Sequence, residues 1–149
     1  MARPAAVAYF SHWRIHCRLV VGNQKHAMAK NILVVDDNED LRQIFATTIR
    51  FFGYQVSEAR SGSEAIEKAA FAKPSLILLD IGLPDMTGID AARAIKKNQV
   101  TADIPIIACS AYGSGEKMEE ARRAGMVDYL QKPVLADLMK AKIEEFILR

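Results

Sequence analysis

The sequence predicts an α/β domain built on a doubly wound, five-stranded parallel sheet. Two observations carry this prediction. Short apolar runs rich in β-branched residues alternate with segments of helical periodicity, five times over about 120 residues. The runs are apolar at successive positions, which is typical of parallel strands buried on both faces. With 149 residues, half of them hydrophobic, the chain is long enough for one such domain with a real core.

The first half of the domain contains two strands and two helices. The first strand is a run of mainly β-branched residues, and the following helix repeats apolar side chains at helical spacing until Gly53. The next strand leads into a helix that ends before Pro74, because the residue preceding a proline is disfavoured in the α conformation. In order, these elements are expected at residues 32–35, 41–52, 54–59 and 63–72.

The second half repeats the pattern three times. Two apolar strands alternate with a helix, and the helix after them stops at Gly125. A short strand then precedes Lys132 and Pro133, and apolar residues at helical spacing mark the closing helix. In order, these elements are expected at residues 76–79, 89–97, 104–109, 116–124, 127–130 and 135–147.

Residues 1–28 lack a clean periodicity and are expected to form a poorly ordered basic leader, with the domain over residues 29–149. A start site upstream of the natural first residue, Met28, would explain the leader. A signal peptide and a short amphipathic helix at residues 10–21 are alternatives. The apolar stretch at residues 5–10 is short for a signal peptide.

The bulk properties argue against several classes of protein. No apolar run is long enough for a transmembrane helix. Four basic residues and no acid lie in the leader, so a net charge of +2 for the whole chain leaves −2 for the domain; we expect no direct binding to nucleic acid or membrane. Cys17 and Cys109 indicate no disulfide framework, and the pair His12 and His16 no metal site. A cytoplasmic location is the simplest expectation.

Polar residues stand where the expected strands end. In a parallel sheet with helices on both faces, ligands bind beyond the carboxyl ends of the strands, so these residues should converge on one crevice. They are Asp36, Asp37, Asp80, Ser110 and Lys132.

This set of side chains suits phosphate chemistry. Three carboxylates favour Mg2+, which prefers oxygen ligands and would allow Asp36 and Asp37 to lie side by side. The ammonium group of Lys132 and the hydroxyl of Ser110 could bind a tetrahedral dianion. Asp80 would be the nucleophile, since phosphoryl transfer needs mainly positioning and charge neutralisation.

At these positions the sequence resembles the response regulator receiver family. The matching motifs are ILVVDDNED, LILLDIGLPDMTG, IIACSAY and DYLQKPV, in this order, and the resemblance covers residues 29–148. Each motif alone is weak, but the four in order are specific. The resemblance implies a flavodoxin-like fold with strand order 2-1-3-4-5.

The resemblance also implies roles for the acidic residues. Asp80 would become an aspartyl phosphate by accepting a phosphoryl group from a histidine kinase. Asp37 and Asp80 would bind Mg2+ directly, Asp36 largely through water, and the backbone carbonyl of Gly82 would complete the site. Because Gly82 replaces a larger side chain that is common in the family, the lifetime of the phosphoryl group is left open.

The remaining residues of the resemblance concern the phosphoryl group and the switch. Lys132 would pair with the phosphoryl oxygens and Ser110 would move towards them. Tyr129 would turn inward as Ser110 moves, Ala111 would keep the approach open, and the bond between Lys132 and Pro133 would be cis.

The expected function is that of a stand-alone, single-domain response regulator in a two-component system or phosphorelay, similar to chemotaxis regulators. Its partners would be a sensor histidine kinase or histidine phosphotransfer protein and an unidentified downstream protein. Three alternatives are a magnesium-dependent aspartyl phosphatase, an inert scaffold, and a nucleotide or flavin module. The acids are adjacent rather than in an Asp-x-Asp pattern, and no glycine-rich phosphate loop follows the first strand.

Each residue also has an ordinary structural interpretation. The pair Asp36 and Asp37 could cap the helix that follows, and Asp80 could be a solvated acid at the end of a strand. Lys132 could lie on the surface, Ser110 could stabilise a turn, and Tyr129 could serve packing alone.

Overall fold

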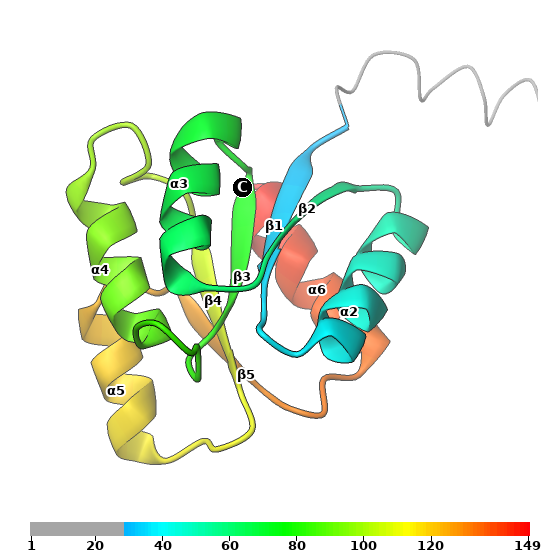
Figure 1. The fold of residues 1–149 in the computed structure, drawn as a ribbon. Coiled ribbons are helices and arrows are strands. Elements are labelled where there is room, and N and C mark those ends of the chain that lie inside the picture. Colours follow the sequence, from blue (N-terminus) through cyan, green and yellow to red (C-terminus); the bar gives the residue numbers. More distant parts are fainter. Residues whose placement is uncertain (1–28) are drawn as a thin grey trace, which may run out of the picture.

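The computed structural model describes residues 29–149, and Figure 1 shows them as a sheet between two layers of helices. The leader, the signal-peptide and amphipathic-helix alternatives, and the histidine pair all fall on residues 1–28, outside the described residues.

Five parallel strands form the sheet in the order β2-β1-β3-β4-β5, which confirms the expected topology. All strands point the same way, so their carboxyl ends meet at one edge of the sheet. The strands are β1 (Asn31–Val35), β2 (Gln55–Ala59), β3 (Leu76–Asp80), β4 (Ile106–Ser110) and β5 (Asp128–Gln131).

Five helices connect and cover the strands. Four of them begin after an Asn, Ser or Thr residue whose side chain accepts a hydrogen bond from a backbone N–H in the first turn. Gly53 and Gly125 follow two of the helices with φ angles of 95° and 92°, the left-handed region expected for glycine there. The helices are α2 (Glu39–Phe51), α3 (Gly62–Ala72), α4 (Gly88–Lys97), α5 (Gly115–Arg123) and α6 (Ala136–Ile147).

The sheet has an apolar core on each face, because successive side chains of a strand point to opposite sides. In β3, Leu76 and Leu78 belong to the core with α2 and α6, whereas Ile77 and Leu79 belong to the core with α3, α4 and α5. The unbroken apolar runs of the sequence follow from this burial on both faces.

Several element boundaries differ from the expected ones. Three strands extend one residue further at the carboxyl end, since Asp80 pairs with Cys109 and Ser110 pairs with Gln131. In contrast, β4 begins two residues later than expected. The N–H of Ile104 donates to the carbonyl of Thr101 in a turn, and the next residue is a proline without an N–H.

Among residues 29–149, no helix combines the length and the apolar character that crossing a bilayer requires.

We predict that Leu78→Ala lowers the free energy of unfolding by about 3 kcal/mol, because it leaves a cavity at a site that is 1% exposed. Phe71→Ala is the matched control, since Phe71 is 92% exposed and its truncation should cost less than about 0.5 kcal/mol. Urea denaturation followed by circular dichroism measures both. Equal losses for the two variants would contradict the placement of the core.

Candidate functional site

The end of β1 places two adjacent acids in different surroundings. Asp36 is 2% exposed, whereas Asp37 is exposed. The Oδ1 of Asp36 accepts a hydrogen bond of 2.9 Å from the N–H of Asn38, and the side chain of Asn38 is the cap of α2. The interpretation of the two aspartates as the helix cap is therefore wrong. Their carboxylates lie instead near the carboxyl end of β3.

Asp80 closes the acidic cluster from the end of β3, where it is 8% exposed. One ligand oxygen from each of Asp36, Asp37 and Asp80 lies within 4.8 Å of the others. The N–H of Gly82 donates to the Oδ1 of Asp80 at 3.2 Å. This hydrogen bond ties the start of the loop after β3 to the Asp80 carboxylate.

Lys132 brings a positive charge into the cluster from the loop after β5. Its Nζ lies 2.6 Å from Asp36 Oδ2 and 3.5 Å from Asp80 Oδ2. Its side chain is only 13% exposed, so the surface interpretation of this lysine is wrong. Its backbone N–H donates to the carbonyl of Ser110, which extends the pairing of β5 with β4. The bond between Lys132 and Pro133 is cis, as the resemblance implied.

The charges of the cluster shift each other's protonation. Burial raises the pKa of Asp80, and the neighbouring Asp36 adds to this effect, while Lys132 and the N–H of Gly82 oppose it. Burial alone would lower the pKa of Lys132, but its hydrogen bond to Asp36 and the two carboxylate charges outweigh that effect and raise it. Lys132 therefore stays a cation, and ionising Asp80 costs more than ionising an aspartate in water.

The donor set fits a hard divalent cation. Three carboxylates supply oxygen ligands, and Asp37 is open to solvent, which leaves room for the waters that Mg2+ retains. Cys109 lies beside Asp80 in the sheet, but burial raises the pKa of its thiol to about 12, so it offers no thiolate for a softer metal.

Ser110 lies at the end of β4, and its hydroxyl is bonded within its own loop. Its Oγ accepts a hydrogen bond of 3.2 Å from the N–H of Tyr112 and lies 3.3 Å from the carbonyl of that residue. The hydroxyl of Tyr129 donates to the same carbonyl at 2.7 Å. Ser110 and Tyr129 thus share one partner, the backbone of Tyr112. Ala111, between Ser110 and Tyr112 in the chain, is exposed.

The geometry places all the predicted residues at one edge of the sheet, in two groups. Asp36, Asp37, Asp80 and Lys132 form the charged cluster, with Gly82 next to it. Ser110 and Tyr129 form a second group around the backbone of residue 112. The role of each residue in the chemistry remains a prediction.

Two supporting residues were not predicted from the sequence. Arg42 donates through Nη1 to the backbone carbonyl of Asp36 at 2.9 Å and lies 3.4 Å from Glu58, so it holds the loop after β1. Asp85 binds the start of α3. The contact of Arg42 could have been found from the sequence, because an arginine in the first turns of a helix can reach back to the strand end before it. The contact of Asp85 joins two distant segments and leaves no local pattern.

The model of the response regulator receiver domain family matches residues 32–144 of this chain. The chain belongs to this family. Membership confirms the resemblance and places the protein among the signalling phosphoacceptors of two-component systems. Receiver domains of this kind take phosphoryl groups from histidine kinases or phosphotransfer proteins and bind Mg2+ at an acidic pocket.

Both stand-alone receivers and a longer regulator are among the similar proteins. The chemotaxis protein CheY of Thermotoga maritima is 40% identical over 107 residues, covering 71% of this chain and 88% of CheY. The polar-differentiation response regulator DivK of Brucella ovis is 35% identical over 107 residues, covering 72% of this chain and 87% of DivK. The phosphate regulon transcriptional regulatory protein PhoB of Pseudomonas aeruginosa is 34% identical over 122 residues, covering 82% of this chain, which spans about half (53%) of PhoB.

Solved receiver structures have the same fold. Vibrio cholerae CheY4 superposes with a TM-score of 0.76 at 29% identity, over 79% of this chain and 98% of CheY4. The receiver domain of the sensor histidine kinase PA1611 from Pseudomonas aeruginosa superposes with a TM-score of 0.77 at 30% identity, over 81% of this chain and 99% of that domain. That structure holds a magnesium ion in its active site cleft.

We predict that Asp80→Asn stabilises the metal-free protein at pH 7. The raised pKa means that the folded wild type holds the Asp80 proton more tightly than the unfolded chain does, so stability is lost as pH rises through that pKa. The variant escapes this loss, while Lys132 keeps its closer partner, Asp36. Urea denaturation of both proteins in a chelating buffer between pH 7 and pH 4 measures the difference.

The advantage of Asp80→Asn should shrink as the pH falls towards the unfolded pKa of about 3.9. A variant that is less stable than the wild type at pH 7, or a difference that does not change with pH, would contradict this assignment of the buried charge.

Proposed function

We propose that this protein is a response regulator that accepts a phosphoryl group on Asp80 and thereby changes a surface for a downstream partner. The observation that carries the proposal is the position of Asp80. Its carboxylate ends the central strand, lies within 4.8 Å of two other acids, and has a lysine ammonium group 3.5 Å away.

The transfer would exchange one bond to phosphorus for another. An oxygen of the Asp80 carboxylate forms the new bond while the bond between phosphorus and an imidazole nitrogen of the donor breaks. The electron pair leaves with the imidazole, which takes up a proton. Lys132 would stay in place and pair with the phosphoryl oxygens, since a reaction of this type needs positioned positive charge rather than further covalent chemistry.

A magnesium ion would be held by Asp36, Asp37, Asp80 and the backbone carbonyl of Gly82, and when bound it supplies the remaining positive charge. The magnesium ion in the similar PA1611 receiver domain supports this cofactor. We place the reaction in the cytoplasm, where the ATP that charges a histidine kinase is found.

The switch would run from Ser110 to Tyr129 through the loop that both residues bind. A phosphoryl group carries a charge of about −1.5 to −2 and strong acceptor oxygens, which compete for the hydroxyl of Ser110. If Ser110 leaves the backbone of Tyr112, the carbonyl that binds Tyr129 is released from one of its two partners. Phosphorylation would thus bias the position of Tyr129.

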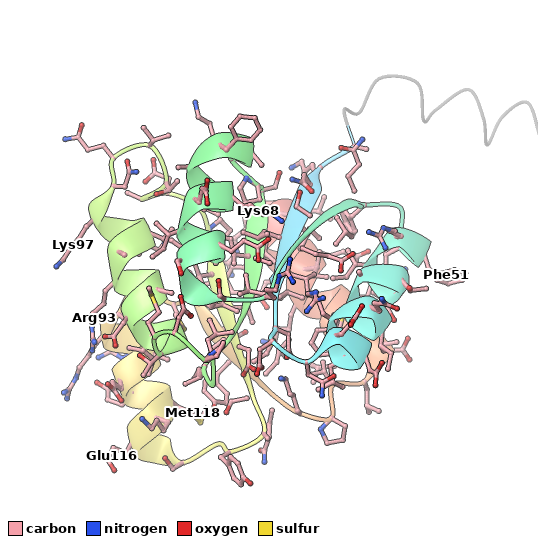
Figure 2. All side chains as sticks on the ribbon, in the orientation of Figure 1. Phe51, Lys68, Arg93, Lys97, Glu116 and Met118 are labelled. Atoms are coloured by element: carbon pink, nitrogen blue, oxygen red, sulfur yellow. The ribbon has the colours of Figure 1, made fainter. Side chains whose placement is uncertain are left out.

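Tyr129 lines a groove of about 380 Å³ between α5 and β5, together with Met118 and Met126. Figure 2 shows Met118 on the side of the molecule that also carries Arg93 of α4, opposite Phe51 of α2. A partner that binds this groove only when Tyr129 has moved would shift the equilibrium by its difference in affinity.

The wild type should gain one phosphoryl group per chain when it is incubated with Mg2+ and a small acyl phosphate, and intact mass spectrometry measures the gain. Asp80→Asn should gain none. Asp40→Asn is the matched control, because it removes an exposed acid from the first turn of α2 and leaves the cluster intact. It should match the wild type within about twofold.

A gain that persists in Asp80→Asn would contradict the choice of nucleophile. No gain in a folded wild type would contradict the proposed function as a whole.

Tyr129→Phe should accept the phosphoryl group at a rate within about twofold of the wild type, because the hydroxyl that it removes binds the Tyr112 carbonyl and not a group of the charged cluster. It should lose most of the phosphorylation-dependent change in hydrogen exchange over residues 111–114 and α5, since the donor to the Tyr112 carbonyl is absent. Mass spectrometry of exchange with and without phosphodonor measures this change. An unaltered response in α5 would contradict the proposed route.

A further inference from the structure

The loop between β3 and α4, residues 81–87, carries Gly82 next to the acidic cluster and is tied to the start of α3 by Asp85. We propose that Asp85 is a positioning residue for the metal site: by binding α3 it fixes the loop that presents the Gly82 carbonyl. The inference rests on the proposed function, because it concerns the same site.

Asp85 makes its contacts with both carboxylate oxygens. Its Oδ1 accepts from the N–H of Gly62 at 2.8 Å, and its Oδ2 accepts from the N–H of Ser63 at 2.9 Å and from the hydroxyl of Ser63. These bonds hold the pKa of the exposed Asp85 carboxyl well below its usual range, because they favour its ionised form.

The start of α3 has a cap of its own. The hydroxyl of Ser61 accepts from the N–H of Glu64 at 3.2 Å, and the Glu64 carboxylate accepts from the N–H of Arg60, the residue before the cap, at 2.9 Å. Asp85 binds two other N–H groups of the same turn, from 22 and 23 residues away in the chain. Its contact joins the loop to the helix, whereas the local cap only ends the helix.

Two glycines allow the loop to lie this close to its neighbours. A Cβ atom at residue 62 would lie 2.3 Å from the Cγ of Met86, so the side chain after Asp85 rests directly on the first turn of α3. A Cβ atom at residue 88 would lie 2.1 Å from the carbonyl oxygen of Asp80. The far end of the loop therefore returns to the backbone of Asp80, and the N–H of Gly88 donates to Ile81 at 2.8 Å.

Gly82 has no such contacts through its own Cα, since a Cβ atom there would meet no atom within 4 Å. Its position depends on its N–H bond to Asp80 and on the rest of the loop. Polar and backbone contacts hold the loop at Asp80 at its start, at Gly88 at its end, and at Asp85 between them, and the side chains of Leu83 and Met86 also pack against the core. Of these contacts, that of Asp85 can be removed without altering the cluster, crowding the backbone or leaving a cavity in the core.

The test compares Asp85→Ala with Ser61→Ala in the full chain. Both variants remove an acceptor from the same turn of α3, but only Asp85→Ala releases the loop. We expect Mg2+ binding, measured by titration calorimetry, to weaken about tenfold in Asp85→Ala, a typical effect of losing a group that supports a metal ligand. Ser61→Ala should bind within about twofold of the wild type. Asp85→Asn keeps one acceptor oxygen, so its Mg2+ affinity should lie between those of the wild type and Asp85→Ala. This variant replaces Asp85→Ala if the latter does not fold.

Amide hydrogen exchange in the metal-free proteins is the second readout. The amide of Gly82 should exchange at least fivefold faster in Asp85→Ala than in the wild type. In Ser61→Ala its exchange rate should be the same as in the wild type. Equal Mg2+ affinities and equal Gly82 exchange in the two alanine variants would overturn the inference. If the wild type binds no Mg2+, the proposed function fails, and the exchange of Gly82 alone decides whether Asp85 positions the loop.

Discussion

The site depends on one buried ammonium group. Lys132 lies 2.6 Å from Asp36 and 3.5 Å from Asp80, and so joins the loop after β5 to the ends of β1 and β3. Without Lys132, the nearly buried carboxylates of Asp36 and Asp80 would repel each other. The free-energy cost of this repulsion is greater where solvent is excluded. With Asp37, three carboxylates and one ammonium group leave a formal charge of −2. This excess charge is costly for the fold, and it is also what attracts a divalent cation.

The alternation of side chains in the sheet separates the chemistry from the switch. Asp80 follows Leu76 and Leu78 on the face of α2 and α6, next to the end of β1. Ser110 follows the β4 residues that face the opposite core, and Tyr129 packs against that core near α5. The turn after β4 leads from the strand end that carries Ser110 to α5. A signal from Asp80 to α5 would therefore run through this turn.

The sequence predicted the sheet and the charged cluster because both follow from simple rules. Apolar runs buried on two faces identify parallel strands, and parallel strands bring their carboxyl ends together, so even Lys132 could be placed with Asp36. The rules do not choose between neighbouring polar side chains, and they do not reach across distant segments. Asn38 and the two aspartates before it are all residue types that cap helices, and only the structure shows that Asn38 is the cap of α2. That Ser110 binds the backbone of residue 112 depends on the path of one loop. That Asp85 reaches α3 joins segments 22 residues apart, and no local pattern records this contact.

The central claim is that the carboxylate of Asp80, which lies beside Lys132 and two further acids, accepts the phosphoryl group. A crystal structure of the protein with Mg2+ and beryllium fluoride, which mimics a phosphoryl group on a carboxylate, tests it most directly. We expect beryllium bonded to an Asp80 oxygen, Mg2+ about 2.1 Å from oxygens of the acidic cluster, and the Ser110 hydroxyl turned from Tyr112 towards fluoride. An adduct on Asp36 or Asp37, or a fully bound cation with Asp80 left free, would contradict the account.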